Sequence, residues 1–348
     1  MQDWKSLALL PEAGLASRDI AIVNLACASG LPGGPTEAEG AECLKRLDEA
    51  AAVVRRYTEH CFPHFTRQPD EYRNSEGYFR VLCMVTVLWH RFGVVYNKAK
   101  IPLGVPLDAE DVFIHGAVLG KGGTCASLPI VYAAVGRRLC YPIKLVATRS
   151  KECGHLFARW DDPDGERFNI EVSYDGMFSH PDDYYRTGHF QLSPKAEENG
   201  AFLKSWTPVQ ELAGFLLGRA NVWERHGRTR KQVDCLAWAS AIAPRTYFYP
   251  NWLCKALDGW KDEMRPKAPA GFPPLSVRVE ERRYPDSLPL EIQHEIYGLE
   301  ATENILNTPE LEERWWKPLR EGRYVPHPPR LAVVEFPRTQ GCNISFRF

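Results

Sequence analysis

The chain lacks the patterns that mark several common classes of protein. Its 348 residues hold 43 Lys and Arg against 44 Asp and Glu. This balance gives no large charge of one sign, so the composition favours neither nucleic acid nor a membrane surface as a partner. No window approaches the roughly 18 uninterrupted apolar residues of a membrane-spanning helix. The first residues show no basic stretch followed by an apolar core, so we expect no secretory signal and a cytoplasmic protein.

The chain also lacks the cysteine spacings of a zinc site. Ten cysteines are scattered along it, and none stands in a C-x-x-C pair. We therefore expect no structural metal, and free buried thiols rather than disulfides for most of them. Cys125 has different surroundings, because it follows Gly122, Gly123 and Thr124 in "GGTCASLPIVYAAVGRRL" and opens a long apolar run.

Apolar residues with helical spacing occur in several segments between residues 36 and 139, and again within 209–244. A capping box formed by Thr36 and Glu39 predicts a helix over 36–57. Three further helical segments are predicted over 75–96, over 110–119, and from residue 126 onward, where Pro129 requires a late or irregular first turn. Two more helices, separated by "RHGRTR", are predicted within 209–244, in the rhythm of a single tetratricopeptide-type unit.

A change of period after residue 142 predicts a sheet. The segments 143–150, 155–162 and 167–173 are typical of strands, with "DDPDGE" as the turn between the last two. Helices followed by an antiparallel sheet indicate an α+β fold. We predict a helical region over 1–74, a catalytic core over 75–200, a helical hairpin over 201–263 and a proline-rich tail over 264–348.

Three residues have the chemistry of an acyl-transfer site. A thiol at a helix start, as predicted for Cys125, is favoured as thiolate. His155 begins one predicted strand, and Glu171 lies in the next. If these strands form a hairpin, the carboxylate can orient the imidazole, which then faces the thiol. Asn169 shares the face of Glu171 and is a second candidate for the orienting group; we favour Glu171 because an anion stabilises an imidazolium.

The blocks "GTCASLPIVYAAVGRRLCYP", "GHLFARW" and "RFNIEVS" together resemble the core of the transglutaminase-like superfamily of papain-type cysteine enzymes. The resemblance covers about residues 75–190 and is closest to a bacterial branch with tetratricopeptide-like helices after the core. It implies a nucleophile helix packed on an antiparallel sheet, with Cys125 as nucleophile, His155 as general base and acid, and Glu171 as orienter. Two features depart from the family: Glu replaces the usual Asp, and Leu156 rather than an aromatic residue follows the histidine.

The remainder of the site is less defined by the sequence. The backbone N–H of Cys125 is a candidate oxyanion donor, and Asn97 or the segment before residue 122 is a candidate for the second donor. Gly123, Thr124 and Trp160 are candidates for lining a substrate cleft.

These residues predict a thioester mechanism on amide or peptide bonds of a protein or peptide substrate, without a cofactor. Water as acceptor makes the chain a deamidase or protease, and a lysine makes it a cross-linker. Acyl transfer from a coenzyme A thioester, with the same three residues, is a weaker alternative. A catalytically silent module that recognises a protein partner through its C-terminal helices is the alternative from another class.

Overall fold

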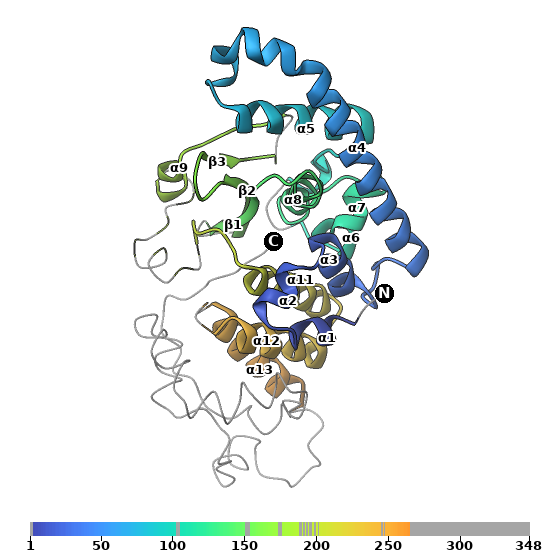
Figure 1. The fold of residues 1–348 in the computed structure, drawn as a ribbon. Coiled ribbons are helices and arrows are strands. Elements are labelled where there is room, and N and C mark those ends of the chain that lie inside the picture. The colour runs from blue at the N-terminus through green and yellow to red at the C-terminus, as the bar shows by residue number, and fades with distance from the viewer. Residues whose placement is uncertain are drawn as a thin grey trace, which may run out of the picture.

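The computed structural model describes residues 3–264, apart from 102–104, 150–153, 173–175, 188, 189, 191, 193, 195, 196, 198, 199, 201, 245 and 247. Helices surround a small sheet (Figure 1). The helices before the sheet are α1 Trp4–Ala8, α2 Glu12–Ala16, α3 Ile20–Ala28, α4 Glu37–Arg67, η1 Pro69–Tyr72, α5 Glu76–Phe92, η2 Lys98–Lys100, α6 Ala109–Val112, α7 Ile114–Val118 and α8 Leu128–Arg138. The sheet and the later helices are β1 Ile143–Arg149, β2 Gly154–Asp161, β3 Arg167–Ile170, α9 Asp182–Arg186, α11 Pro208–Arg225, α12 Thr229–Ile242 and α13 Phe248–Met264. The α+β prediction is confirmed at this level.

The long helix α4 begins where the sequence predicts it. Thr36 Oγ1 accepts the N–H of Glu39, and the Glu39 carboxylate accepts the N–H of Thr36, so the capping box is present. The helix continues about ten residues beyond the predicted end at 57, through Pro63 to Arg67. Its last turns are held by aromatic packing, since the rings of Phe65 and Phe79 of α5 stack at 5.0 Å. Packing against α5 therefore extends the helix beyond the end of its own apolar stripe.

Helix α8 is buried in the centre of the molecule, against the sheet (Figure 1). It begins at Leu128, three residues later than a helix headed by Cys125 requires. Pro129 explains the late start, because a proline in the first turn lacks only an N–H that has no intrahelical partner there. The helix approaches β1 closely at Gly136, where an added Cβ would stand 2.4 Å from Ile143 Cδ1. A larger residue at 136 would displace the end of the Ile143 side chain.

The sheet has the strand order β1-β2-β3 and is antiparallel throughout, as the sequence predicts. Thr148 pairs with His155 across β1 and β2, and Arg159 pairs with Asn169 across β2 and β3. The outer edge of β1 is covered by the segment 203–206, whose N–H groups donate to Ala147 O and Leu145 O. One face of the sheet packs on α8, and the other packs on α9, where Phe157 and Tyr185 stack at 4.4 Å.

Helices α11, α12 and α13 pack in succession at the C-terminal end of the described residues. The predicted pair within 209–244 is confirmed as α11 and α12, but a third helix, α13, was not predicted and packs on α12. Helix α11 is fastened to the N-terminal helices by Arg219, whose Nη1 donates to the carbonyls of Cys27 and Ser29 at 2.6 and 2.7 Å. The first and last helical regions thus form one packed body. The predicted tail lies outside the described residues from 265 onward.

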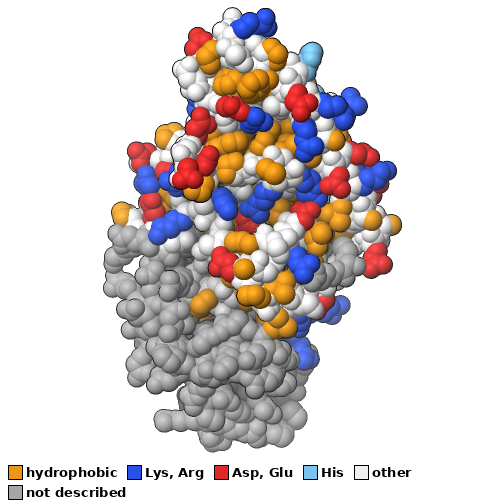
Figure 2. Space-filling view, viewed as in Figure 1, with side chains coloured by type: hydrophobic (Ala, Val, Ile, Leu, Met, Phe, Trp, Pro, Cys, Tyr) orange, Lys and Arg blue, Asp and Glu red, His pale blue; other side chains and the backbone are white. Residues whose placement is uncertain are grey.

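The mixed surface charges and the free cysteines are those that the composition leads us to expect. Acidic and basic side chains are interspersed on the face in Figure 2, and apolar side chains show on the tip formed by α4, η1 and α5. Of the eight cysteines in the described residues, all are free and five are buried, as expected; Cys153 and Cys342 lie outside the described residues.

Candidate active site

Cys125 lies in a tight turn that leads into α8 and is partly exposed. Two buried hydroxyls fix this turn, because Thr124 Oγ1 and Ser127 Oγ both donate to the carbonyl of Asp111, each at 2.8 Å. Thr124 Oγ1 also accepts the N–H of Ala126, and Ser127 Oγ accepts the N–H of Thr124. The turn is therefore anchored to α6 on both sides of the cysteine.

The glycines before the cysteine allow another segment to approach. Gly122 has φ +81°, and an added Cβ there would stand 3.1 Å from Asn97 Cβ. Gly123 pairs with the segment after α5: its N–H donates to Val95 O at 2.9 Å, and its carbonyl accepts the N–H of Asn97 at 2.8 Å. This bridge brings Tyr96 beside the thiol.

The imidazole of His155 lies between the thiol and a carboxylate. His155 Nε2 stands 2.5 Å from Glu171 Oε2, and the His155 side chain also hydrogen bonds with the side chain of Cys125. Because Nε2 engages the carboxylate, Nδ1 is the ring nitrogen that remains for the sulfur. The three side chains predicted to converge are brought together.

Glu171 is held by backbone pairing beyond the end of β3. Its N–H donates to Phe178 O at 2.8 Å, and its carbonyl accepts the N–H of Phe178 at 3.0 Å. The residue is 3% exposed, and His155 has a side-chain exposure of 13%. The backbone of Glu171 is thus paired through its N–H and its carbonyl, and its side chain is buried. A carboxylate fixed in this way supports the imidazole in one orientation.

The electrostatics of the site favour a protonated His155. Burial alone would lower the pKa of His155, but the negative charge of Glu171 and the hydrogen bonds with Cys125 and Glu171 raise that pKa well above its ordinary value. The structure therefore favours a charged imidazolium between the Cys125 side chain and the Glu171 carboxylate.

Tyr96 is a site residue that the sequence did not reveal. Its hydroxyl hydrogen bonds with the side chain of Cys125 and accepts the backbone N–H of Cys125. Burial raises the pKa of Tyr96, and the neighbouring Cys125 sulfur raises it further, so the group remains a neutral donor. Asn97, the candidate named from the sequence, is the next residue, and its Oδ1 accepts the N–H of Ala99 in its own loop.

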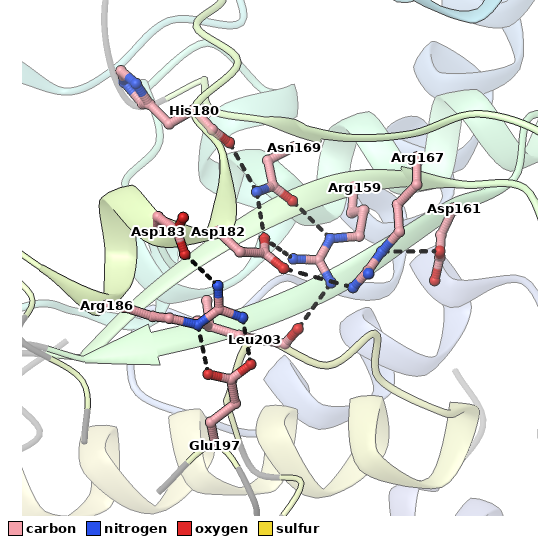
Figure 3. Close-up of polar contacts among 10 residues, drawn as sticks. All are labelled: Arg159, Asp161, Arg167, Asn169, His180, Asp182, Asp183, Arg186, Glu197 and Leu203. Atoms are coloured by element: carbon pink, nitrogen blue, oxygen red, sulfur yellow. Dashed lines mark hydrogen bonds and ion pairs between the residues drawn. The ribbon is translucent and has the colours of Figure 1, made fainter. Parts of the chain in front are cut away.

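Asn169 does not orient the imidazole. Its Oδ1 accepts Arg159 Nε at 2.6 Å, and its Nδ2 donates to the His180 carbonyl and to Asp182 Oδ1 (Figure 3). Arg159 has no exposed side-chain surface and also donates to Asp182 Oδ1 at 2.6 Å. Asn169 of β3 and Glu171 just beyond it lie on the same face. The residue opposite Asn169 on β2 is Arg159, so Asn169 bonds with the Arg159–Asp182 pair rather than with the imidazole.

The predicted cleft residues Gly123, Thr124 and Trp160 are all buried. Trp160 is 7% exposed and stacks on Phe168 at 5.9 Å in the core. Gly123 and Thr124 are buried, and their polar groups hold the cysteine turn. The surroundings of His155 are instead aromatic: the ring of Phe190 lies 5.4 Å from the imidazole and contacts Tyr184, which is 41% exposed. Sequence patterns alone gave no signal for this wall, because it depends on how α9 folds back on the sheet.

Comparison with protein-family models, with curated proteins and with solved structures found no match for this chain. Within the described residues, no helix is long and apolar enough to cross a membrane. The same part of the chain contains no group of three or more His, Cys, Asp or Glu placed to hold a metal ion. The geometry around Cys125 is therefore the basis on which a function is inferred.

Proposed function

We propose that the chain is a transglutaminase-like cysteine enzyme that acts on amide or peptide bonds through a thioester. The observation that carries the proposal is the position of His155, which contacts both the Cys125 side chain and the Glu171 carboxylate. A buried packing cysteine needs no such partners, whereas a nucleophile needs a base and the base needs an orienting group.

The contacts support a defined sequence of steps. The Cys125 sulfur bonds to the carbonyl carbon of the substrate as the C=O electron pair moves to oxygen. The oxyanion is stabilised by the N–H of Cys125 and by the Tyr96 hydroxyl, which turns from the sulfur to the new charge. The proton of His155 passes to the amine nitrogen as the C–N bond breaks, and the amine leaves a thioester behind.

A second nucleophile completes the cycle. Water or an amine attacks the thioester carbonyl, and His155 takes the proton that the nucleophile loses. The C–S bond then breaks, and sulfur leaves as thiolate beside the imidazolium that has just formed. Water gives a carboxylate product, and an amine gives a new amide. Glu171 holds the ring in place throughout and stabilises the imidazolium at both stages.

The test compares the wild-type protein with Cys125→Ala and Cys140→Ala. Cys140 is an exposed free thiol, so its variant controls for nonspecific thiol chemistry. Each protein is incubated with a mixed peptide library and a biotinylated amine, and deamidated, cleaved and amine-joined peptides are quantified by mass spectrometry. We expect products that disappear in Cys125→Ala and persist in Cys140→Ala. Equal loss in both variants, or no product from the wild type, would contradict the proposal.

The same proteins distinguish the enzyme from a silent binding module. A thiolate stabilised by His155 is alkylated by iodoacetamide well below pH 8. A rate that follows an ordinary thiol pKa of about 8.5 would indicate a module that keeps the fold without the chemistry.

A further inference from the structure

A row of aromatic side chains leads away from the imidazole of His155, along α9 and the segment before it. Between ring centroids, Phe190 lies 5.4 Å from the imidazole, and Tyr184 lies 5.9 Å from Phe190. The imidazole of His180 stacks on Tyr184 at 4.0 Å, with the two planes 14° apart. Phe178 follows at 6.0 Å from His180, with its plane only 3° from that of His180. We call Phe190, Tyr184, His180 and Phe178 the aromatic row.

The outer part of the aromatic row faces solvent. Tyr184 is 41% exposed and Phe178 is 45% exposed, whereas Phe190 and His180 are half-buried. Aromatic side chains usually bury most of their surface, because each can remove about 150–250 Å² from water. Exposed rings beside a proposed active site therefore offer surface that a ligand can cover.

Polar contacts from β3 and the residue after it hold the aromatic row from behind (Figure 3). The backbone of Phe178 pairs with that of Glu171 through two hydrogen bonds, of 2.8 and 3.0 Å. Asn169 Nδ2 donates to the carbonyl of His180 at 2.9 Å and to Asp182 Oδ1, at the start of α9, at 2.7 Å. Positions 178, 180 and 182 are thus fixed to the strand that leads to the proposed active site. A surface held in place loses little conformational entropy when a ligand binds.

The charged side chains beside the aromatic row are paired with one another (Figure 3). The pairs are Arg159–Asp182, Arg167–Asp182, Arg186–Asp183 and Arg186–Glu197. Because these charges compensate each other, ring surface rather than net charge is what this part of the molecule offers to a ligand. A nucleobase would also stack on the rings, but its phosphate would meet guanidinium groups that are already paired.

The proposed chemistry places the aromatic row on one side of the substrate. His155 gives its proton to the amine that leaves and takes a proton from the amine that attacks, so the amine side of the substrate lies next to the imidazole. The Cys125 sulfur, which carries the acyl group, and the Glu171 carboxylate engage different nitrogens of that ring. Because Phe178 is paired with Glu171, the row extends from the imidazole away from the sulfur.

We infer that the aromatic row binds an aromatic side chain on the amine side of the substrate, an inference that rests on the proposed function. The step from the imidazole to Phe190 is 5.4 Å and the next step is 5.9 Å, so the ring of Tyr184 lies at most about 11 Å from the imidazole. An extended chain spans about 3.3–3.6 Å per residue, so the bound ring belongs to one of the first three residues after the amine nitrogen.

The first test measures binding without catalysis. Peptides of the form Gly-Gly-X-amide, with X as Phe, cyclohexylalanine or Leu, are titrated into full-length Cys125→Ala by calorimetry. Phe and cyclohexylalanine have similar apolar surfaces, so the ratio of their affinities isolates the aromatic interaction. We expect the Phe peptide to bind roughly 2- to 12-fold more tightly. Equal affinities for the two peptides would overturn the inference, and so would tighter binding of adenosine monophosphate.

Variants of the aromatic row locate the bound ring. In the Cys125→Ala background, Tyr184→Ala should abolish the preference for Phe over cyclohexylalanine, and Tyr184→Phe should keep it. Tyr57→Ala is the matched control, because it removes a ring with a similar exposure of 37% from α4. This control should keep the full preference. A preference that survives in Tyr184→Ala, or that is lost equally in Tyr57→Ala, would count against the row.

Product formation by the wild-type protein separates the two proposals. The Gly-Gly-X-amides replace the biotinylated amine in the peptide-library assay. Joined products are quantified for each X, and the residues that follow each cleaved bond are identified. A preference for Phe in binding without any product would leave the row intact and contradict the proposed catalysis. Products formed without a preference for an aromatic amine side would do the reverse.

Discussion

Replacing Glu171 by Gln tests the electrostatic basis of the site. Gln keeps the size and a carbonyl acceptor for His155 Nε2, which lies 2.5 Å from the carboxylate, but it removes the charge. A hydrogen bond to a charged group contributes about 1.5–3 kcal/mol, against about 1 kcal/mol for a neutral one. The loss of about 0.5 to 2 kcal/mol lowers the population of the thiolate–imidazolium pair by roughly 2- to 30-fold.

The assay is the rate of Cys125 alkylation by iodoacetamide from pH 5 to 10. At neutral pH and below, we expect Glu171→Gln to react roughly 2- to 30-fold more slowly than wild type, because the charge that stabilises the imidazolium is gone. Above about pH 9 the two rates should converge, since the thiolate then forms without help from the imidazolium.

Asp164→Asn is the matched control, because it removes one carboxylate from the exposed turn between β2 and β3. Its profile should overlie that of the wild type. Identical profiles for wild type and Glu171→Gln would refute the claim that the carboxylate stabilises an imidazolium beside the sulfur.

Three further predictions follow from single contacts. Tyr96→Phe removes a candidate oxyanion donor, so turnover of an amide should fall about 10²–10³-fold while alkylation of Cys125, which forms no oxyanion, changes far less; equal losses in both rates would contradict this role. Asp182→Ala leaves the buried Arg159 guanidinium without its carboxylate and should cost about 3 kcal/mol in urea unfolding, whereas a loss under about 1 kcal/mol would mean that the guanidinium is sufficiently paired without it. Because the folded state raises the pKa of His155 above 6.5, the stability that this protonation contributes is complete below pH 6.5 and is lost as pH rises through the higher value; the unfolding free energy lost in His155→Gln should therefore be greater at pH 6 than at pH 10, and an equal loss at both would argue against the raised pKa.

Local chemistry explains which parts of the fold the sequence predicts. The Thr36 capping box and the turn between β2 and β3 depend on residues three to six positions apart, and both are present. The contact between His155 and Glu171 is also nearly local, since one hairpin register brings them together across a separation of 16 residues. That register, together with alternation along each strand, places both side chains on one face.

Contacts between distant segments explain what the sequence did not predict. Tyr96 lies beside Cys125 because the segment after α5 pairs with Gly123. Neither segment has a sequence pattern that predicts this pairing. Trp160 is a cleft candidate from the sequence, but the alternation of side chains along a strand does not say which face of the strand meets the core. Its neighbours Tyr141 and Phe168 decide that question.

The supports of the nucleophile link the C-terminal helices to the proposed chemistry. The turn that holds Cys125 is anchored to the carbonyl of Asp111, and the carboxylate of Asp111 is itself fixed by Lys100 Nζ at 2.8 Å. The next residue, Val112, packs against Gly218 of α11, so α6 lies between the cysteine turn and the first C-terminal helix. Because packed interiors transmit displacement, a shift of α11 reaches the thiol through one short helix. The helical extension is thus a support of the cysteine turn, and a core cut off before α11 would lose that support.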